Sequence, residues 1–122
     1  GEKEKVETTD CADALTTYGY ATNVHVDPSS GAESSIGGET STNYIKVKNG
    51  DILYMNGVNP FGMYGTTMYF VYFDTNKTRI GAESKDVAPS TFTINCEGVA
   101  WVRITQLASL TSAKLSVNIP IS

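Results

Sequence analysis

Residues 43–51 read Asn-Tyr-Ile-Lys-Val-Lys-Asn-Gly-Asp and combine two signals of β-structure. Two apolar residues alternate with two lysines over residues 45–48, which is the pattern of a strand with one buried face and one solvated face. Asn49-Gly50 then predicts a tight hairpin turn, because both residue types tolerate a positive φ. The stretch therefore predicts a half-buried strand that turns back into a second strand.

The chain on either side of this stretch is also rich in β-forming residues. Short runs of Thr, Val, Ile, Tyr and Phe are separated by Gly, Asn, Asp and Pro, and helix signals are confined to one turn at residues 10–16. Seven or eight short strands at this spacing predict an all-β fold, an antiparallel, jelly-roll-like β-sandwich. Longer breaks fall at residues 27–42 and 57–66. The expected strands are residues 18–26, 43–47, 51–56, 67–74, 77–81, 91–95, 99–106 and 114–119.

Length and composition indicate one globular domain. The 122 residues are 40% hydrophobic and 18% charged, which allows one sizeable core and little more. Residues 1–9 open with Gly and a run of charged residues, so we expect a tag remnant or linker tail there and a single β-sandwich domain over residues 10–122. The net charge of −4 disfavours nucleic acid and anionic membranes as partners. No apolar run has the length of a membrane span.

The two cysteines, Cys11 and Cys96, are far apart in the sequence. A disulfide between them would tie the N-terminal segment to a late strand and stabilise the fold by a few kcal/mol. Two unconnected thiols are the alternative. The spacing excludes a CxxC motif of the redox or zinc type.

Alternation assigns faces to the later strands. Trp101 and Arg103 fall on the face opposite the apolar one, which we expect to be the outer face of a sheet. Residues 68–73 are apolar on both faces and predict a central strand that is covered on both sides or faces a partner subunit. His25, between two valines, is expected on a solvated face. The residues expected in the core are Ile45, Val47, Ala100, Val102 and Ile104.

Three sequence motifs, which occur in this order along the chain, resemble those of a known family. They are residues 43–51, then Tyr72-Phe73-Asp74-Thr75-Asn76-Lys77, then Val99-Ala100-Trp101-Val102-Arg103-Ile104. Together they resemble a jelly-roll domain of bacteriophage tail, baseplate and minor structural proteins and of surface proteins of gut bacteria. Asn49 stands where that family often has Pro, and Trp101 replaces the usual Tyr. The resemblance spans roughly residues 20–117, and it implies a carbohydrate-binding or assembly module without catalytic residues.

Catalytic and metal-binding patterns are weak. The chain has one histidine, His25, whereas nucleophilic triads need a histidine base. Asp51 and Asp74 lie at expected turns, where Asp is favoured for local hydrogen bonding rather than as half of an acid pair. The segment after Asp74 begins like a calcium loop, but Arg79 and Lys85 occupy the positions that need Gly and Glu. We therefore expect no enzyme activity, no metal and no cofactor.

Aromatic residues indicate a contact surface instead. They make up 10% of the chain, and Phe61 and Tyr64 lie among turn residues in a loop. Sugars stack their apolar ring faces on aromatic side chains while their hydroxyls bond to polar groups. The candidate carbohydrate-binding residues are Trp101 and Arg103 on the sheet, and Phe61 and Tyr64 on the loop. Two alternatives remain: the sheet face is covered by a neighbouring subunit or by residues 27–42, and the loop aromatics form a small satellite core.

The sequence thus predicts a non-catalytic module that binds cell-surface carbohydrate, part of a phage tail or bacterial surface protein. Such a module would act outside cells or on a virion. The alternative is a structural or oligomerisation domain of a phage particle, such as one in a homotrimeric fibre, with no glycan ligand. The exposure of Trp101 discriminates between the two hypotheses.

Overall fold

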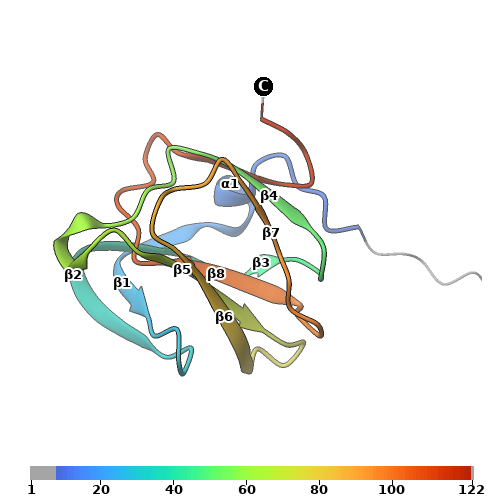
Figure 1. The fold of residues 1–122 in the computed structure, drawn as a ribbon, viewed down its shortest axis with the longest axis horizontal. Helices are drawn as coiled ribbons and strands as arrows, with labels where there is room; N and C mark the ends of the chain where they lie inside the picture. Colours follow the sequence, from blue (N-terminus) through green and yellow to red (C-terminus); the bar gives the residue numbers. More distant parts are fainter. Residues whose placement is uncertain (1–7, 122) are drawn as a thin grey trace, which may run out of the picture.

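The computed structural model describes residues 8–121, and of Tyr64 it describes the backbone alone. This part of the chain holds nine strands, one short helix and one 3-10 turn (Figure 1). In chain order the elements are α1 (Ala14–Tyr18), β1 (Tyr20–Val26), β2 (Glu33–Thr42), β3 (Ile45–Lys46), β4 (Ile52–Asn56), η1 (Gly62–Tyr64), β5 (Met68–Phe73), β6 (Arg79–Lys85), β7 (Thr91–Thr93), β8 (Trp101–Thr105) and β9 (Lys114–Val117).

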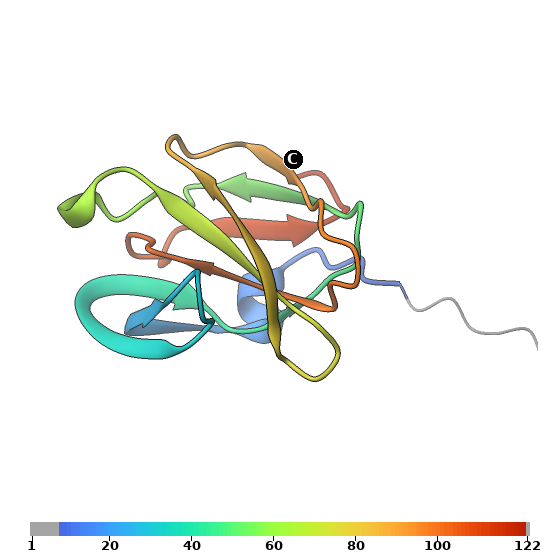
Figure 2. The same cartoon turned by 60° about the horizontal axis from the view of Figure 1, so that its bottom comes forward.

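Two antiparallel sheets form the body of the domain. One has the strand order β3-β8-β5-β6 and the other has the order β7-β4-β9. Figure 2 shows β7, β4 and β9 on one side and β5, β6 and β8 on the other. The predicted all-β, antiparallel sandwich is confirmed.

The main core lies between these two sheets. The rings of Phe70 in β5 and Phe92 in β7 stack almost parallel with centroids 3.8 Å apart, and so join the two layers. The alternation of apolar residues correctly identified which side chains would face inward, because a strand repeats every two residues. The residues predicted for the core are all buried, namely Ile45, Val47, Ala100, Val102 and Ile104.

A third, two-stranded sheet covers part of the outer face of the larger sheet. In this β1–β2 hairpin, Val26 packs against Val71 and Phe73 of β5. Its backbone N–H also donates to the Thr105 hydroxyl at 2.9 Å. The run over residues 68–73 is therefore covered on both sides, as predicted. The expectation of a strandless break over residues 27–42 was wrong, because β2 shows no apolar alternation and buries polar residues instead.

The Asn49–Gly50 turn is tight, but it does not form a hairpin. The Asp51 N–H donates to the Lys48 carbonyl at 3.1 Å, and Gly50 has a φ of 90° while Asn49 has no positive φ. This is the type II geometry, which splays the flanking strands, whereas hairpins favour types I′ and II′. Accordingly, β3 pairs with β8, and β4 pairs with β7 and β9. The turn carries the chain from one sheet to the other.

The N-terminal boundary lies earlier than expected. Thr9 is buried, and its hydroxyl donates to the Asp51 carboxylate, so the packed body includes a residue that we had assigned to the tail. Residues 1–7 of that expected tail lie outside the described part. The predicted helical turn also starts later, because the side chain of Asp13 accepts the Thr16 N–H at 3.2 Å and caps α1. No helix among residues 8–121 is long and apolar enough to cross a membrane.

Cys11 and Cys96 are both free thiols, so the disulfide considered from the sequence is absent. Cys11 instead exchanges backbone hydrogen bonds with Val117 at 3.0 and 2.8 Å, which adds the N-terminal segment to β9. Burial, and then the charge of Glu83, raise the pKa of the Cys96 thiol. The N-terminal segment is therefore held by backbone pairing rather than by a covalent bridge.

Candidate functional site

Arg103 lies on the outer face of the larger sheet as predicted, but that face is not open at this point. The side chain is 2% exposed, because the β1–β2 hairpin covers it. Its Nε–H donates to the Thr42 carbonyl at 2.9 Å, and Nη1 lies 2.7 Å from a carboxylate oxygen of Glu33. The guanidinium also lies 5.0 Å from the centroid of the Tyr44 ring. Arg103 therefore holds β2 onto the sheet. Of the two readings kept open from the sequence, cover by residues 27–42 is the one found at this residue.

Trp101 is half-buried beside the same hairpin. Its ring packs edge-on against Tyr44, with centroids 6.5 Å apart. The ammonium groups of Lys46 and Lys77 lie 4.8 and 5.2 Å from its centroid, as cation–π partners. Two lysines thus occupy space close to the indole in which a sugar ring would have to stack.

Phe61 and Tyr64, the two predicted loop residues, lie near the C-terminal end of β8, whereas Trp101 lies at its start. The Phe61 N–H donates to the Gln106 carbonyl at 2.8 Å, and the half-buried Phe61 ring packs against the bend of β2. A Cβ at Gly38 would come within 2.9 Å of this ring, so glycine is required for the close approach. Tyr64 ends η1, and its side chain lies outside the described part of the structure. The structure does not bring the sheet pair and the loop pair together.

His25 was expected on a solvated face, but it does not lie on one. Its Nδ1 lies 2.6 Å from a carboxylate oxygen of Glu39, whose side chain is fully buried under the hairpin. This pair links β1 to β2 on the side that faces the sheet. We therefore assign His25 a structural role in the hairpin. Among residues 8–121 no group of three or more His, Cys, Asp or Glu side chains could hold a metal ion.

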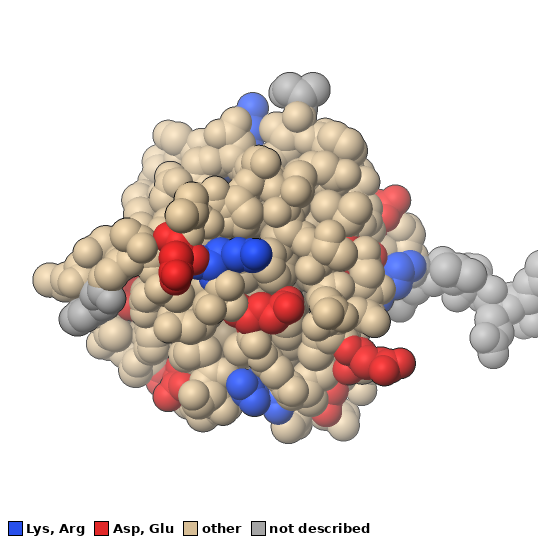
Figure 3. Space-filling model, viewed as in Figure 1, with Lys and Arg blue, Asp and Glu red and all other residues tan. Residues whose placement is uncertain are grey.

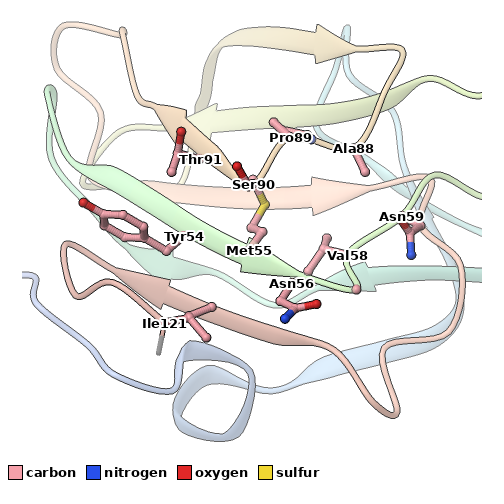
Figure 4. A pocket seen from close by; sticks show the side chains of 11 residues that line it. Tyr54, Met55, Asn56, Val58, Asn59, Ala88, Pro89, Ser90, Thr91 and Ile121 are labelled. Carbon is pink, nitrogen blue, oxygen red and sulfur yellow. The ribbon is translucent and has the colours of Figure 1, made fainter.

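A groove of about 430 Å³ lies at the end of the smaller sheet (Figure 4). Tyr54 and Thr91 lie at one end of it, Asn59 and Ala88 lie at the other, and the buried Met55 forms part of its floor. The full lining is Tyr54, Met55, Asn56, Gly57, Val58, Asn59, Ala88, Pro89, Ser90, Thr91 and Ile121.

The groove is positioned by the pairing of β4 with β7. Tyr54 lies opposite Thr91 in this ladder, and the Met55 N–H donates to the Ser90 carbonyl at 2.8 Å just beyond it. Alternation along β4 buries Leu53 and Met55 and leaves Tyr54 half-buried. The chain then leaves the sheet at Gly57, and residues 57–59 form the far wall of the groove.

The lining of this groove is uncharged. It contains no Asp, Glu, Lys, Arg or His, whereas the side chains of Asn56, Asn59, Ser90 and Thr91 are exposed to solvent. An amide side chain offers both donors and acceptors, and a hydroxyl does the same, so together they match the mixed hydrogen bonding of a sugar. Tyr54 adds an aromatic ring at the end of the groove where Thr91 lies (Figure 4).

A larger depression of about 810 Å³ lies between α1 and residues 110–121. Its lining combines aliphatic and hydroxyl side chains, includes the charged Asp13 and Lys114, and contains no amide side chain. Tyr20 is its one aromatic residue and is 37% exposed. This depression has less of the chemistry that recognises a sugar, but it provides a control for the groove.

Charged side chains do not gather into a patch of one sign on the face drawn in Figure 3. Lysines and arginines are scattered there among acidic and uncharged residues. A nucleic-acid interface would instead require clustered basic groups. This face gives no support to a polyanion-binding function.

Sequence reasoning did not identify the groove. A local signal was present, because Tyr54 and Asn56 fall on the partly exposed face of an alternating strand. The other wall comes from residues 88–91 and from Ile121, which are distant in sequence.

A scan against protein-family models finds no matching family, and searches of curated proteins and of solved structures return no match.

Proposed function

We propose that this domain is a non-catalytic carbohydrate-binding module and that the groove at the end of the smaller sheet, between residues 54–59 and 88–91, holds the sugar. The observation that carries the proposal is the combination of a half-buried Tyr54 with exposed amide and hydroxyl side chains and no charged group. A neutral sugar needs such a surface, with one apolar platform and several hydrogen-bonding groups. General acid–base catalysis would require an ionisable group at the reacting bond, and the described lining offers no carboxylate or imidazole.

The expected affinity is weak at a single groove. One stacked aromatic contributes about 1 kcal/mol beyond its buried area, so we expect a dissociation constant near 1 mM. Useful attachment would then need many copies on one particle, which raise the apparent affinity through avidity. The resemblance to phage tail and bacterial surface domains supports such a setting, outside cells or on a virion, with cell-surface carbohydrate as the partner.

The test is a glycan-array screen with the domain displayed multivalently, followed by variants. Tyr54→Ala should reduce binding by about fivefold, because it removes the stacking platform. Asn59→Ala should also reduce it, since the exposed amide of Asn59 is lost. Thermal melting of each variant checks that the fold is intact.

Two matched controls locate the site. Tyr20→Ala removes a tyrosine from the other depression, and Trp101→Phe changes the sheet residue singled out from the sequence. Both should bind as the wild-type protein does. If one of the controls lost binding while Tyr54→Ala still bound normally, the sugar site would lie at Tyr20 or at Trp101, whichever control had lost binding. A wild-type domain that binds no glycan would favour the structural or oligomerisation role instead.

A further inference from the structure

The groove contains one of the two Asn–Gly pairs in this chain, Asn56–Gly57, and the other is Asn49–Gly50. In such pairs the backbone nitrogen of the glycine can attack the side-chain amide carbon of the asparagine, because glycine has no Cβ to hinder the approach. The sequence gives both pairs the same intrinsic reactivity. The structure treats them differently.

Asn49–Gly50 is held by two hydrogen bonds. The side-chain oxygen of Asn49 accepts the Cys96 N–H at 2.9 Å, and the Gly50 N–H donates to the Ile94 carbonyl at 2.9 Å. Both reacting groups are thus engaged, although Asn49 and Gly50 are exposed. Attack at this pair requires that both hydrogen bonds break.

Asn56–Gly57 has neither restraint. Both residues are exposed, and within residues 8–121 neither the Asn56 side chain nor the Gly57 N–H has a hydrogen-bond partner. Gly57 has a φ of 75° and follows the last residue of β4, where the ladder has ended. Both the nucleophile and the amide that it attacks are therefore exposed to water and not held by a hydrogen bond.

We propose that Asn56 is a site of spontaneous deamidation and that Asn49 is protected by the fold. The Gly57 nitrogen bonds to the side-chain carbonyl carbon of Asn56, and the bond from that carbon to the amide nitrogen breaks. The nitrogen leaves as ammonia, which carries away the Gly57 proton, and a cyclic imide remains. One water molecule then opens the imide to aspartate or isoaspartate, with no change of oxidation state.

The product changes the chemistry of the groove. A carboxylate appears in a lining that otherwise carries no charge, and isoaspartate also lengthens the main chain at the end of β4. If the groove holds a neutral sugar, as proposed above, deamidation would weaken attachment as the protein ages. This consequence rests on the proposed function, whereas the deamidation itself does not.

The experiment is incubation of the folded domain at mildly alkaline pH and physiological temperature, with peptide mapping by mass spectrometry. Each hydrogen bond is worth roughly a factor of five in an equilibrium, so Asn56 should convert at least about tenfold faster than Asn49. In urea, where the fold is lost, the two rates should become similar. Asn56→Gln should suppress conversion at this position, because the longer side chain forms the ring less readily.

Equal or faster conversion of Asn49 in the folded protein would overturn the proposal. A rate difference that persists in urea would also overturn it, because local sequence rather than structure would then be the cause. The sugar-binding consequence is read separately, by comparing fresh protein, the Asn56→Asp variant and aged protein on the glycan array. Conversion of Asn56 without loss of binding would leave the deamidation site standing and would count against the groove as the sugar site.

Discussion

Tyr72 lies in β5, and it is the only polar residue among the three of this strand that face the main core. Its ring is buried, and its hydroxyl donates to a carboxylate oxygen of Glu83 in the neighbouring strand β6. Burial raises the pKa of the Tyr72 phenol far above its usual value, and the hydrogen bond and charge of Glu83 raise it further. The folded state therefore strongly favours the neutral phenol.

This arrangement predicts a loss of stability at alkaline pH. A tyrosine in the unfolded chain ionises near pH 10, whereas Tyr72 in the folded protein stays neutral to a higher pH. The free energy of unfolding is therefore insensitive to this group below about pH 10 and falls as the pH rises above it. Tyr72→Phe should lower stability at neutral pH but flatten this alkaline loss, measured by urea unfolding at a series of pH values. If the free energy of unfolding fell equally with rising pH in both proteins, the buried Tyr72 phenol would not be the cause of the alkaline loss.

At the residue scale, alternation predicted the faces of side chains well. It placed Val102 and Ile104 inward and Trp101 and Arg103 on the opposite face, and the structure agrees. It could not show what lies over that opposite face. Whether an outward residue meets water or another segment depends on contacts that are distant in sequence, so alternation left open whether Arg103 is exposed or covered by residues 27–42, and the structure shows that it is covered.

Among the elements, β2 differs most from expectation. Its second half buries Glu39, Thr40, Ser41 and Thr42, and their hydrogen bonds go to groups elsewhere in the fold. The Thr42 hydroxyl accepts the Ile104 N–H at 2.8 Å, and Thr40 exchanges backbone hydrogen bonds with Leu107. Such a strand shows no apolar periodicity, because its buried face is polar and bonds to tertiary partners, although one carboxylate oxygen of Glu39 has no hydrogen-bond partner among the described residues. Local patterns therefore predicted a loop.

The hairpin should depend on Arg103 much more than on its ion-pair partner. Arg103→Ala removes a buried side chain that bonds to the Thr42 carbonyl and packs on Tyr44, and we expect it to lower the free energy of unfolding by about 2 kcal/mol. Glu33→Ala should lower it by less than about 1 kcal/mol, because the Glu33 side chain is 58% exposed and its charge is screened. Chemical denaturation measures both. Equal losses would show that the ion pair with Glu33, rather than the bond to the Thr42 carbonyl, holds the hairpin.

At the scale of the whole molecule, the sandwich brings distant segments together to form the groove. The β4 wall and residues 88–91 meet because β4 pairs with β7, and Ile121 closes the groove from beyond β9. The fold class followed from strand spacing and turn residues, which are local. The site depends on which strands pair, and the type II turn at Asn49–Gly50 shows how one turn sends neighbouring strands into different sheets. A groove of this kind could not be read from separate segments.

The most direct test of the carbohydrate-binding account is an NMR titration of the isotopically labelled domain. The probe is the neutral oligosaccharide that binds most strongly on the glycan array. We predict that the amide signals that shift will belong to residues 54–59 and 88–91, with the Trp101 indole and the signals of Lys46 and Lys77 unchanged. Shifts centred on Trp101 and the two lysines, or no shifts at millimolar sugar, would contradict the account.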